Sequence, residues 1–293
     1  GQNPMVRVKT SNQSDRGGWR LMAARGMGVG LVLCSSVALF NLVRFQLTSP
    51  LRGASELAVV HEPFPIRGLR SISMKVSHDD CMDPIRLGRS GDGGWWACGK
   101  LSTPCTVYSF GIFDSFSFDQ AVADKGCKVH GFDPSKPGLK SKPAYERIHG
   151  ATYHEFGIGG VDRKYGPGEV PFSWPGIGYL TETNSDPWQL YALPSIMKKN
   201  NHDHLSILKV DVEGSEWAAM EGILSSSWDQ LLVEFHFHPA QFKLIKEGNG
   251  VSIESSEESP MLELVEKLVT IATLWKLDWN GNQCLELSWI RKT

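Results

Sequence analysis

The stretch TVYSFGIFDSFSFDQAVADKGCKVHGFD, from Thr106 to Asp133, decides the fold. Its β-branched and aromatic start predicts a buried strand over 106–112. Its middle predicts a helix over 119–125 that a glycine ends. A second strand is predicted over 127–132, and Asp133 follows it directly. A strand–loop–helix–strand unit of this length suits a right-handed crossover between two parallel strands.

This unit places the loop at Gly111 and the acid Asp133 at the same edge of a parallel sheet. At that edge a loop backbone approaches a nucleotide and an acid bonds ribose hydroxyls. The two residues are 22 positions apart (133 − 111), close to the roughly 20 typical of such sites. The loop has a single glycine and an acid, Asp114, which repels a pyrophosphate but pairs with an amine. We therefore expect S-adenosylmethionine rather than a dinucleotide, with a ligand-free structural unit as the alternative.

The segment after Asp133 predicts a third strand and a long insertion. The connection 134–145 shows little helical signal, and 151–158 alternates as a strand that ends with Gly157 and Ile158. In a nucleoside site these two residues border the adenine. Residues 161–190 are rich in Gly, Pro and Trp. Because long irregular loops are usually functional or disordered, we interpret this insertion as a lid on the substrate side.

A fourth strand is predicted over 205–211, and it ends on an acid. Glu213 and Gly214 then turn the chain into a helix over 215–224. Asp211 and Glu213 thus face the same crevice as Asp133, which makes them candidates for cofactor binding and catalysis. The alternative is structural, because acids stabilise the start of a helix.

A fifth strand, predicted over 228–238, carries His236 and His238 two positions apart. Either imidazole, like Asp211 or Glu213, is a candidate base for an oxygen acceptor. Packing or surface exposure is the alternative for both histidines. No histidine is spaced with a cysteine as a zinc site requires, so we predict no metal ligand. A divalent ion bridging the two acids has no support from spacing.

Two other regions belong to the globular part. The block RLGRSGDGGWW, 86–96, has a tight-turn signal at Asp92. It predicts either a hairpin before the first core strand or a loop over the cofactor, with Asp92 near the methionine end. Further on, we expect a polar loop over 247–259. A helix over 261–269 and final strands over 275–279 and 284–291 come after it.

Six cysteines occur, five of them in the globular part. We expect a disulfide between Cys98 and Cys105, or between Cys81 and one of these. Cys127 and Cys284 lie in predicted strands and are interpreted as buried thiols. An odd number leaves at least one cysteine free.

The N-terminal quarter, residues 1–75, is organised differently. Residues 1–25 are basic, 26–43 form an uncharged apolar run of 18 residues (43 − 26 + 1), and 44–75 are an irregular linker to a domain over 76–293. The flanking charges favour a signal anchor with a cytosolic N-terminus and a domain in the ER or Golgi lumen. A cleaved signal peptide, giving a secreted protein, and a buried helix are the alternatives. The net charge of −2 argues against binding nucleic acid.

Four motifs, SFGIFDSFSFD, VHGFDPS, LKVDVEGSEW and RLGRSGDGGWW, resemble the methyltransferase-like protein 24 family, a relative of FkbM-type methyltransferases. The resemblance covers about 76–292. It implies an α/β class I methyltransferase fold: a Rossmann-like, seven-stranded, mostly parallel sheet with an antiparallel last strand and helices on both faces. The cofactor positions it implies are Gly111, Asp133, Asp211 and the Glu213–Gly214 turn. The glycine loop is poorer in glycine than the usual family pattern.

The predicted function is S-adenosylmethionine-dependent O-methylation of a sugar or another small acceptor in the secretory pathway. One alternative is an inactive domain of the same fold that binds a glycan or protein partner. Another is an NAD-dependent oxidoreductase, which the single-glycine loop disfavours.

Overall fold

The computed structural model describes residues 69–293, apart from 92, 100, 167–187, 240, 257–258 and 282. The expected basic tail, the apolar run 26–43, Asp92 and most of the insertion lie outside these residues. Within the described part, no helix is long and apolar enough to cross a membrane. The predicted membrane anchor therefore stays a prediction.

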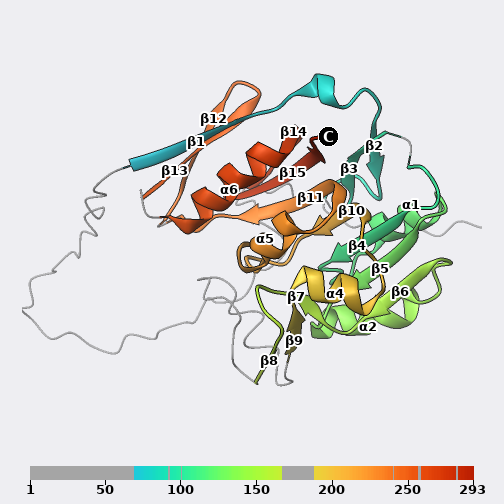
Figure 1. Ribbon diagram of the computed structural model, residues 1–293. Helices are drawn as coiled ribbons and strands as arrows, with labels where there is room; N and C mark the ends of the chain where they lie inside the picture. The colour runs from blue at the N-terminus through green and yellow to red at the C-terminus, as the bar shows by residue number, and fades with distance from the viewer. Residues whose placement is uncertain are drawn as a thin grey trace, which may run out of the picture. The chain divides into compact units, whose positions relative to one another are not determined.

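A seven-stranded sheet with the order β14-β15-β11-β10-β4-β5-β6 forms the centre of the described part (Figure 1). Its members are β4 (Thr106–Phe110), β5 (Lys128–Phe132), β6 (Ala151–His154), β10 (Leu205–Val210), β11 (Trp228–His236), β14 (Ala272–Asn280) and β15 (Cys284–Arg291). The last strand, β15, runs antiparallel to both β11 and β14, and the β6-β5-β4-β10-β11 pairings are all parallel. The predicted class I methyltransferase fold is confirmed.

Helices cover both faces of this sheet. Successive residues of a strand point to opposite faces, so each face carries apolar side chains that pack against helices. In β4, Tyr108 and Phe110 belong to the core that the first group of helices covers, whereas Val107 belongs to the core on the opposite face. The first group is α4 (Leu193–Lys199), α5 (Glu216–Ser225) and α6 (Pro260–Ile271). The second is α1 (Ser117–Ala123) and α2 (Lys136–Tyr145).

The helix α2 corrects the expectation of a connection without helix over 134–145. Its start is capped, since the Gly138 N–H donates to Ser135 Oγ at 3.2 Å, and Pro137 suits the first turn. Its end is held by Tyr145, which is fully buried and donates to Asp119 Oδ1 at 2.9 Å. The apolar signal is weak because the helix buries few side chains.

Two smaller sheets correct other boundaries. The predicted strand 151–158 is two strands, since β7 (Gly157–Ile158) leaves the main sheet and joins β9 (Trp188–Tyr191) and β8 (Arg163–Tyr165). The expected loop 247–259 is largely a strand, β13 (Gly250–Ser256). It pairs with β12 (Lys243–Glu247) and with β1 (Leu69–Lys75), which takes up the last seven residues of the expected linker.

The block 86–96 is a hairpin, as one of its two interpretations predicted. Its strands β2 (Pro84–Leu87) and β3 (Trp95–Cys98) pair antiparallel, after a short helix η1 (His78–Asp80). The hairpin is attached to the sheet, because Gln230 Nε2 donates to the Cys98 carbonyl at 2.8 Å. It is also attached to the start of α1, where Ser117 Oγ donates to the Gly93 carbonyl at 2.9 Å.

Two disulfides join described cysteines. Cys81 is bonded to Cys98, one of the expected pairings, and Cys105 to Cys127. The interpretation of Cys127 as a buried thiol was wrong, because its strand runs beside that of Cys105 and brings the two Cα atoms within 4.7 Å. Cys284 is also disulfide-bonded. None of the five described cysteines is a free thiol, contrary to expectation.

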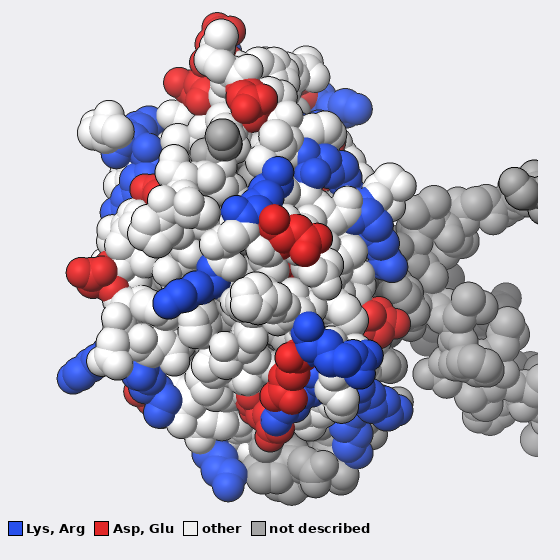
Figure 2. All heavy atoms as spheres, turned by 90° about the vertical axis from the view of Figure 1, so that its right-hand side faces the viewer, with Lys and Arg blue, Asp and Glu red and all other residues white. Residues whose placement is uncertain are grey.

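Charged side chains of both signs share the face shown in Figure 2. Lys and Arg are interspersed there with Asp and Glu, and acidic and basic groups lie next to one another. This mixing agrees with the small net charge of −2. Long-range attraction to a highly charged polymer needs a field of one sign, which interspersed charges weaken.

Candidate active site

The first loop and the end of β10 approach each other at Gly111. This glycine has φ +79°, and a Cβ there would lie 1.7 Å from the Asp211 carbonyl oxygen. Its N–H donates to the Phe132 carbonyl at 3.1 Å. Only glycine allows this contact, so the ends of β4, β5 and β10 meet at one point of the sheet edge.

Lys209 is buried beneath the contact between the first loop and Asp211. No sequence motif indicated a role for it. Its Nζ donates to the carbonyls of Phe110 and Gly111 at 3.0 and 2.8 Å and lies 3.5 Å from Asp211 Oδ2. The side chain is only 6% exposed. A lysine within the mainly apolar strand LSILKV is the signal that could have indicated it.

Asp133 ends β5, as predicted, and holds the first loop. Its Oδ2 accepts from the Phe113 N–H at 2.6 Å and its Oδ1 from the Ser135 N–H at 2.7 Å. Burial raises the pKa of this carboxyl, although these hydrogen bonds act in the opposite direction. A carboxylate has about four acceptor positions. The Ser135 side chain and the Ile112 backbone also act on this carboxylate by hydrogen bonding, so in this structure its acceptor positions serve the loop.

The loop itself is fixed in an unusual conformation. Phe113 has φ +47°, rare for a residue with a side chain, and its carbonyl accepts from Ser141 Oγ of α2 at 2.9 Å. Such backbone is found mainly where a site requires it. The neighbouring Asp114 is exposed to solvent.

Gly157 and Ile158 are buried in β7, outside the main sheet. A Cβ at Gly157 would lie 3.3 Å from Pro134 Cδ. The pair therefore lies next to the residue that follows Asp133. The structure places these predicted adenine-side residues near the acid at the end of β5.

Three of the four predicted catalytic residues lie together beyond β10 and β11. The side-chain ligand atoms of Asp211, Glu213 and His236 are all within 4.8 Å of one another. His236 Nε2 lies 3.3 Å from Glu213 Oε2. His238 is not a member of this acidic cluster, and its carbonyl accepts from the Gln241 N–H in the turn after β11.

Glu216 orients the histidine, a role that the sequence did not suggest. Its Oε1 accepts from the His236 N–H at 2.9 Å and lies 3.0 Å from His236 Nδ1. Its Oε2 accepts from the Gly214 N–H at 2.8 Å. Glu216 is fully buried. Glu216 lies in the first turn of α5, where acids are favoured, and α5 turns this side chain under β11.

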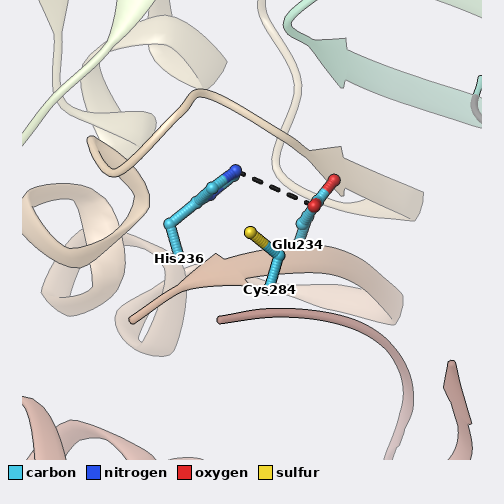
Figure 3. Close-up of side chains that lie close together, drawn as sticks. All are labelled: Glu234, His236 and Cys284. Carbon is cyan, nitrogen blue, oxygen red and sulfur yellow. Dashed lines mark ion pairs between the residues drawn. The ribbon is translucent and has the colours of Figure 1, made fainter. Parts of the chain in front are cut away.

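Glu234 lies on the same side of β11 as His236, two residues earlier. Its Oε1 is 3.8 Å from His236 Nε2 and accepts from Asn280 Nδ2 at 3.0 Å. Figure 3 shows the carboxylate and the imidazole pointing toward each other, with Cys284 of the neighbouring strand β15 beside them. Because Cys284 is disulfide-bonded, its sulfur is not available as a thiolate.

The carboxylates set the electrostatics of the cluster. Burial alone would lower the pKa of His236, but Glu216 and Glu213 outweigh it and hold that pKa well above its ordinary value. Burial, and then the charge of Asp211, raise the pKa of Glu234 well above its ordinary value. Burial also raises the pKa of Asp211, against the attraction of Lys209.

The strand order, the glycine loop and the acids after β5 and β10 define a class I methyltransferase sheet. The chain belongs to the family described as "Methyltransferase domain", whose model matches residues 77–259. S-adenosylmethionine is the methyl donor of this family.

Two relatives support the resemblance found in the sequence. The chain is 27% identical over 202 residues to the Homo sapiens protein named "Probable methyltransferase-like protein 24". The aligned region covers 64% of this chain and 50% of that protein. It is 26% identical over 203 residues to the Rattus norvegicus protein of the same name, with the same coverage. The chain thus spans about half the length of these relatives.

Solved structures of other methyltransferases are more distant. The N-terminal domain of EvdMO1, crystallised in the presence of SAH and D-fucose, has a TM-score of 0.36 and 8% identity, covering 65% of this chain and 77% of that chain. The 1,6-didemethyltoxoflavin-N1-methyltransferase of Burkholderia thailandensis has a TM-score of 0.35 and 11% identity, covering 65% and 72%. At such low TM-scores these likenesses carry no functional conclusion.

Proposed function

We propose that the chain transfers a methyl group from S-adenosylmethionine to a hydroxyl of a sugar or another small acceptor. The observation that carries this proposal is the contact of Gly111 with Asp211, because it sets the expected cofactor loop against the acidic cluster. A methyl donor at the loop and an acceptor at the cluster are then neighbours. Such positioning supplies much of the acceleration of a displacement reaction.

On this proposal the cofactor lies across the ends of β4 and β5. Asp133 bonds the ribose hydroxyls in exchange for some of the loop groups that it holds in this structure. Asp114, exposed at the tip of the loop, pairs with the amino group of the methionine part. Gly157 and Ile158 border the adenine. These assignments rest on the place of each residue at the sheet edge.

The acceptor oxygen attacks the methyl carbon in line with the carbon–sulfur bond. That bond breaks, its electron pair stays on sulfur, and S-adenosylhomocysteine leaves. The hydroxyl proton passes to Asp211, whose side chain is 22% exposed. His236 and Glu234 are only 5% and 3% exposed, so they act from behind Asp211. Glu213, 41% exposed, orients the acceptor.

The proposed location is the lumen of the secretory pathway. Two disulfides between described cysteines support it, because such bonds persist in oxidising compartments. The proposed topology is a single-pass type II membrane protein anchored by 26–43, with secretion as the alternative.

A specific observation favours a second function, a binding module without turnover. Asp133 is 5% exposed, and the Phe113 N–H occupies one of its oxygens. If the loop keeps this position, the ribose has little access to the acid. The protein would then hold a glycan or protein partner through the same sheet edge.

Transfer of label decides between the two functions. The whole chain is incubated with isotope-labelled S-adenosylmethionine and an extract of secretory-pathway glycans and small molecules, and labelled products are identified by mass spectrometry. We expect a labelled hydroxyl and a 10²–10⁴-fold slower transfer by Asp211→Asn. Asp229→Asn, a change at an exposed acid of β11, is the matched control. Cofactor binding without any labelled product would favour the binding module.

A further inference from the structure

The acidic cluster gathers several carboxylates around one imidazole. Four carboxylates gather around His236, and the buried ammonium group nearest to them is Lys209, 3.5 Å from Asp211. They are Asp211, Glu213, Glu216 and Glu234. Buried charges are costly unless they are paired or bind a metal. Carboxylates that converge in this way are also the usual ligands of a hard cation.

We infer that Asp211, Glu213 and His236 bind one divalent cation of the Mn²⁺ or Mg²⁺ class. This inference rests on the proposed function, because it places the cation where the acceptor hydroxyl reacts. Carboxylate oxygens suit these hard cations, and one imidazole is compatible with Mn²⁺.

The geometry of the three ligands fits such an ion. All three ligand atoms lie within 4.8 Å of one another. The 3.3 Å between His236 Nε2 and Glu213 Oε2 is close to the roughly 3 Å that separates neighbouring ligands at bonds of about 2.1 Å. Little movement is needed to close the three groups around one ion.

The imidazole of His236 supplies an independent observation. The His236 side chain is 5% exposed, and its Nε2 is paired with Glu213 Oε2 at 3.3 Å as an ion pair but meets no geometric criterion for a hydrogen bond with a described residue. Its Nδ1, in contrast, faces the buried Glu216 at 3.0 Å. A carboxylate that accepts from Nδ1–H is the usual partner behind a histidine ligand, and a metal ion would bind at Nε2 by displacing the proton there.

A second group of ligands near the same histidine is less suitable. Glu234, His236 and Cys284 also lie within 4.8 Å of one another. The disulfide at Cys284 removes its thiolate, and Glu234 is 3% exposed. The Asp211 side is open instead, since Asp211 and Glu213 are 22% and 41% exposed. An ion and an acceptor can enter from that side.

A cation here would act directly on the acceptor. A hydroxyl bound in an open coordination position loses its proton more easily, because the cation stabilises the oxyanion. A carboxylate has two oxygens, so Asp211 can bind the ion with one and take the proton with the other. The substrate class is then an alcohol whose oxygen is a metal ligand.

Titration of the whole chain with Mn²⁺, followed by the electron paramagnetic resonance signal of the free ion, tests this site. We expect one saturable site per chain. Asp211→Asn and His236→Gln should weaken it at least 10-fold, and Glu216→Gln about 10–100-fold through the orientation of His236. Glu221→Gln removes an exposed acid from the same helix, α5, and should leave Mn²⁺ binding unchanged.

A wild-type chain without a saturable Mn²⁺ site overturns the inference, and so does a folded Asp211→Asn variant that binds Mn²⁺ as the wild type does. If His236→Gln fails to fold, these two measurements still decide. Calorimetry with S-adenosylmethionine separates the two proposals. Cofactor binding without a Mn²⁺ site overturns the inference alone. A Mn²⁺ site without cofactor binding sustains it and overturns the proposed function.

Discussion

At the scale of single residues, one ammonium group connects the cofactor loop with the acidic cluster. Lys209 Nζ donates to the Phe110 and Gly111 carbonyls and attracts Asp211. Lys209→Met should lower the free energy of unfolding by about 1.5–3 kcal/mol, because hydrogen bonds from a charged group are lost. Denaturant unfolding measures the change. Lys128→Met, at an exposed position of β5, is the control, and an equal effect of both would contradict this role.

Asp133 is expected to contact both the protein and the cofactor. Asp133→Ala should weaken S-adenosylmethionine binding by about 1.5–3 kcal/mol, as hydrogen bonds to a charged acceptor disappear. Calorimetry measures the affinity. Because the change also releases the Phe113 N–H, Ser141→Ala, which releases the Phe113 carbonyl instead, measures the effect of a loosened loop alone. Unchanged affinity in a folded Asp133→Ala variant would remove the ribose assignment.

The sequence predicted which residues form the acidic cluster, but it did not predict how they contact one another. Asp211, Glu213 and His236 were found because acids and histidines after predicted strands share one sheet edge. The contact of Glu216 with His236 was not predicted, since nothing in a sequence shows that α5 turns this acid under His236. Tertiary packing decided that role, and it also separated His238 from the cluster.

At the scale of elements, the contact between the first loop and β10 depends on a single glycine. Gly111→Ala should cost about 3–5 kcal/mol of stability, because left-handed backbone and a collision with the Asp211 carbonyl add together. Gly91 has the same φ of +79° and no atom within 4 Å of a Cβ. Gly91→Ala should therefore cost only about 1–2 kcal/mol. Similar losses in thermal or chemical unfolding would show that the contact is unimportant.

The unit β4–α1–β5 was predicted closely because its apolar pattern and its glycines are strong local signals. The helix α2 was missed because Pro137 and Pro143 hide it, although Ser135 before a proline is a typical helix start. The strand β13 was missed because polar residues, two of them buried serines, make up more than half of it, although Val251 and Ile253 alternate and are fully buried.

The neighbouring strands β5 and β6 carry a pair of histidines that links stability to pH. His130 Nδ1 lies 3.0 Å from His154 Nε2, and burial lowers the pKa of each to about 4. The unfolded chain, with an ordinary pKa near 6.5, therefore binds protons first as pH falls. The neutral histidine pair therefore contributes its full stability to the fold above about pH 6.5, and this stability is lost as the pH falls toward 4.

Denaturant unfolding between pH 8 and pH 4 tests this prediction. The double change His130→Gln with His154→Gln should flatten the loss of stability between pH 6.5 and 4, relative to the wild type. His204→Gln, at an exposed position, should keep the wild-type slope. An unaltered slope in the double variant would assign the loss to carboxyl groups instead.

At the scale of the whole molecule, the disulfides and the proposed site occupy opposite ends of the core strands. Cys105 and Cys127 directly precede β4 and β5, at the amino ends of these strands. The glycine loop and Asp133 lie after the carboxyl ends. Cys81–Cys98 fixes the hairpin at β3. Reduction should therefore change the stability of the fold without changing the chemistry of the site.

The two bonds close loops with sequence separations of 17 and 22 residues. Loops of this length correspond to about 3 kcal/mol of stability each. The paired changes Cys81→Ser with Cys98→Ser, and Cys105→Ser with Cys127→Ser, should each lower the free energy of unfolding by about that amount. The cofactor affinity of the molecules that remain folded should be unchanged. Loss of affinity would show that the amino ends of the strands control the site.

The same four thiols test the proposed compartment. A chain made in cells and alkylated before lysis should show these cysteines blocked from alkylation if the domain folds in the lumen, since only an oxidising compartment keeps such bonds. Replacing the apolar run 26–43 by a polar segment should retain the domain in the cytosol, where the same cysteines become alkylated. Mass spectrometry of the labelled peptides distinguishes the two states. Alkylation of all four in the unaltered chain would place the domain in a reducing compartment and overturn the lumenal assignment.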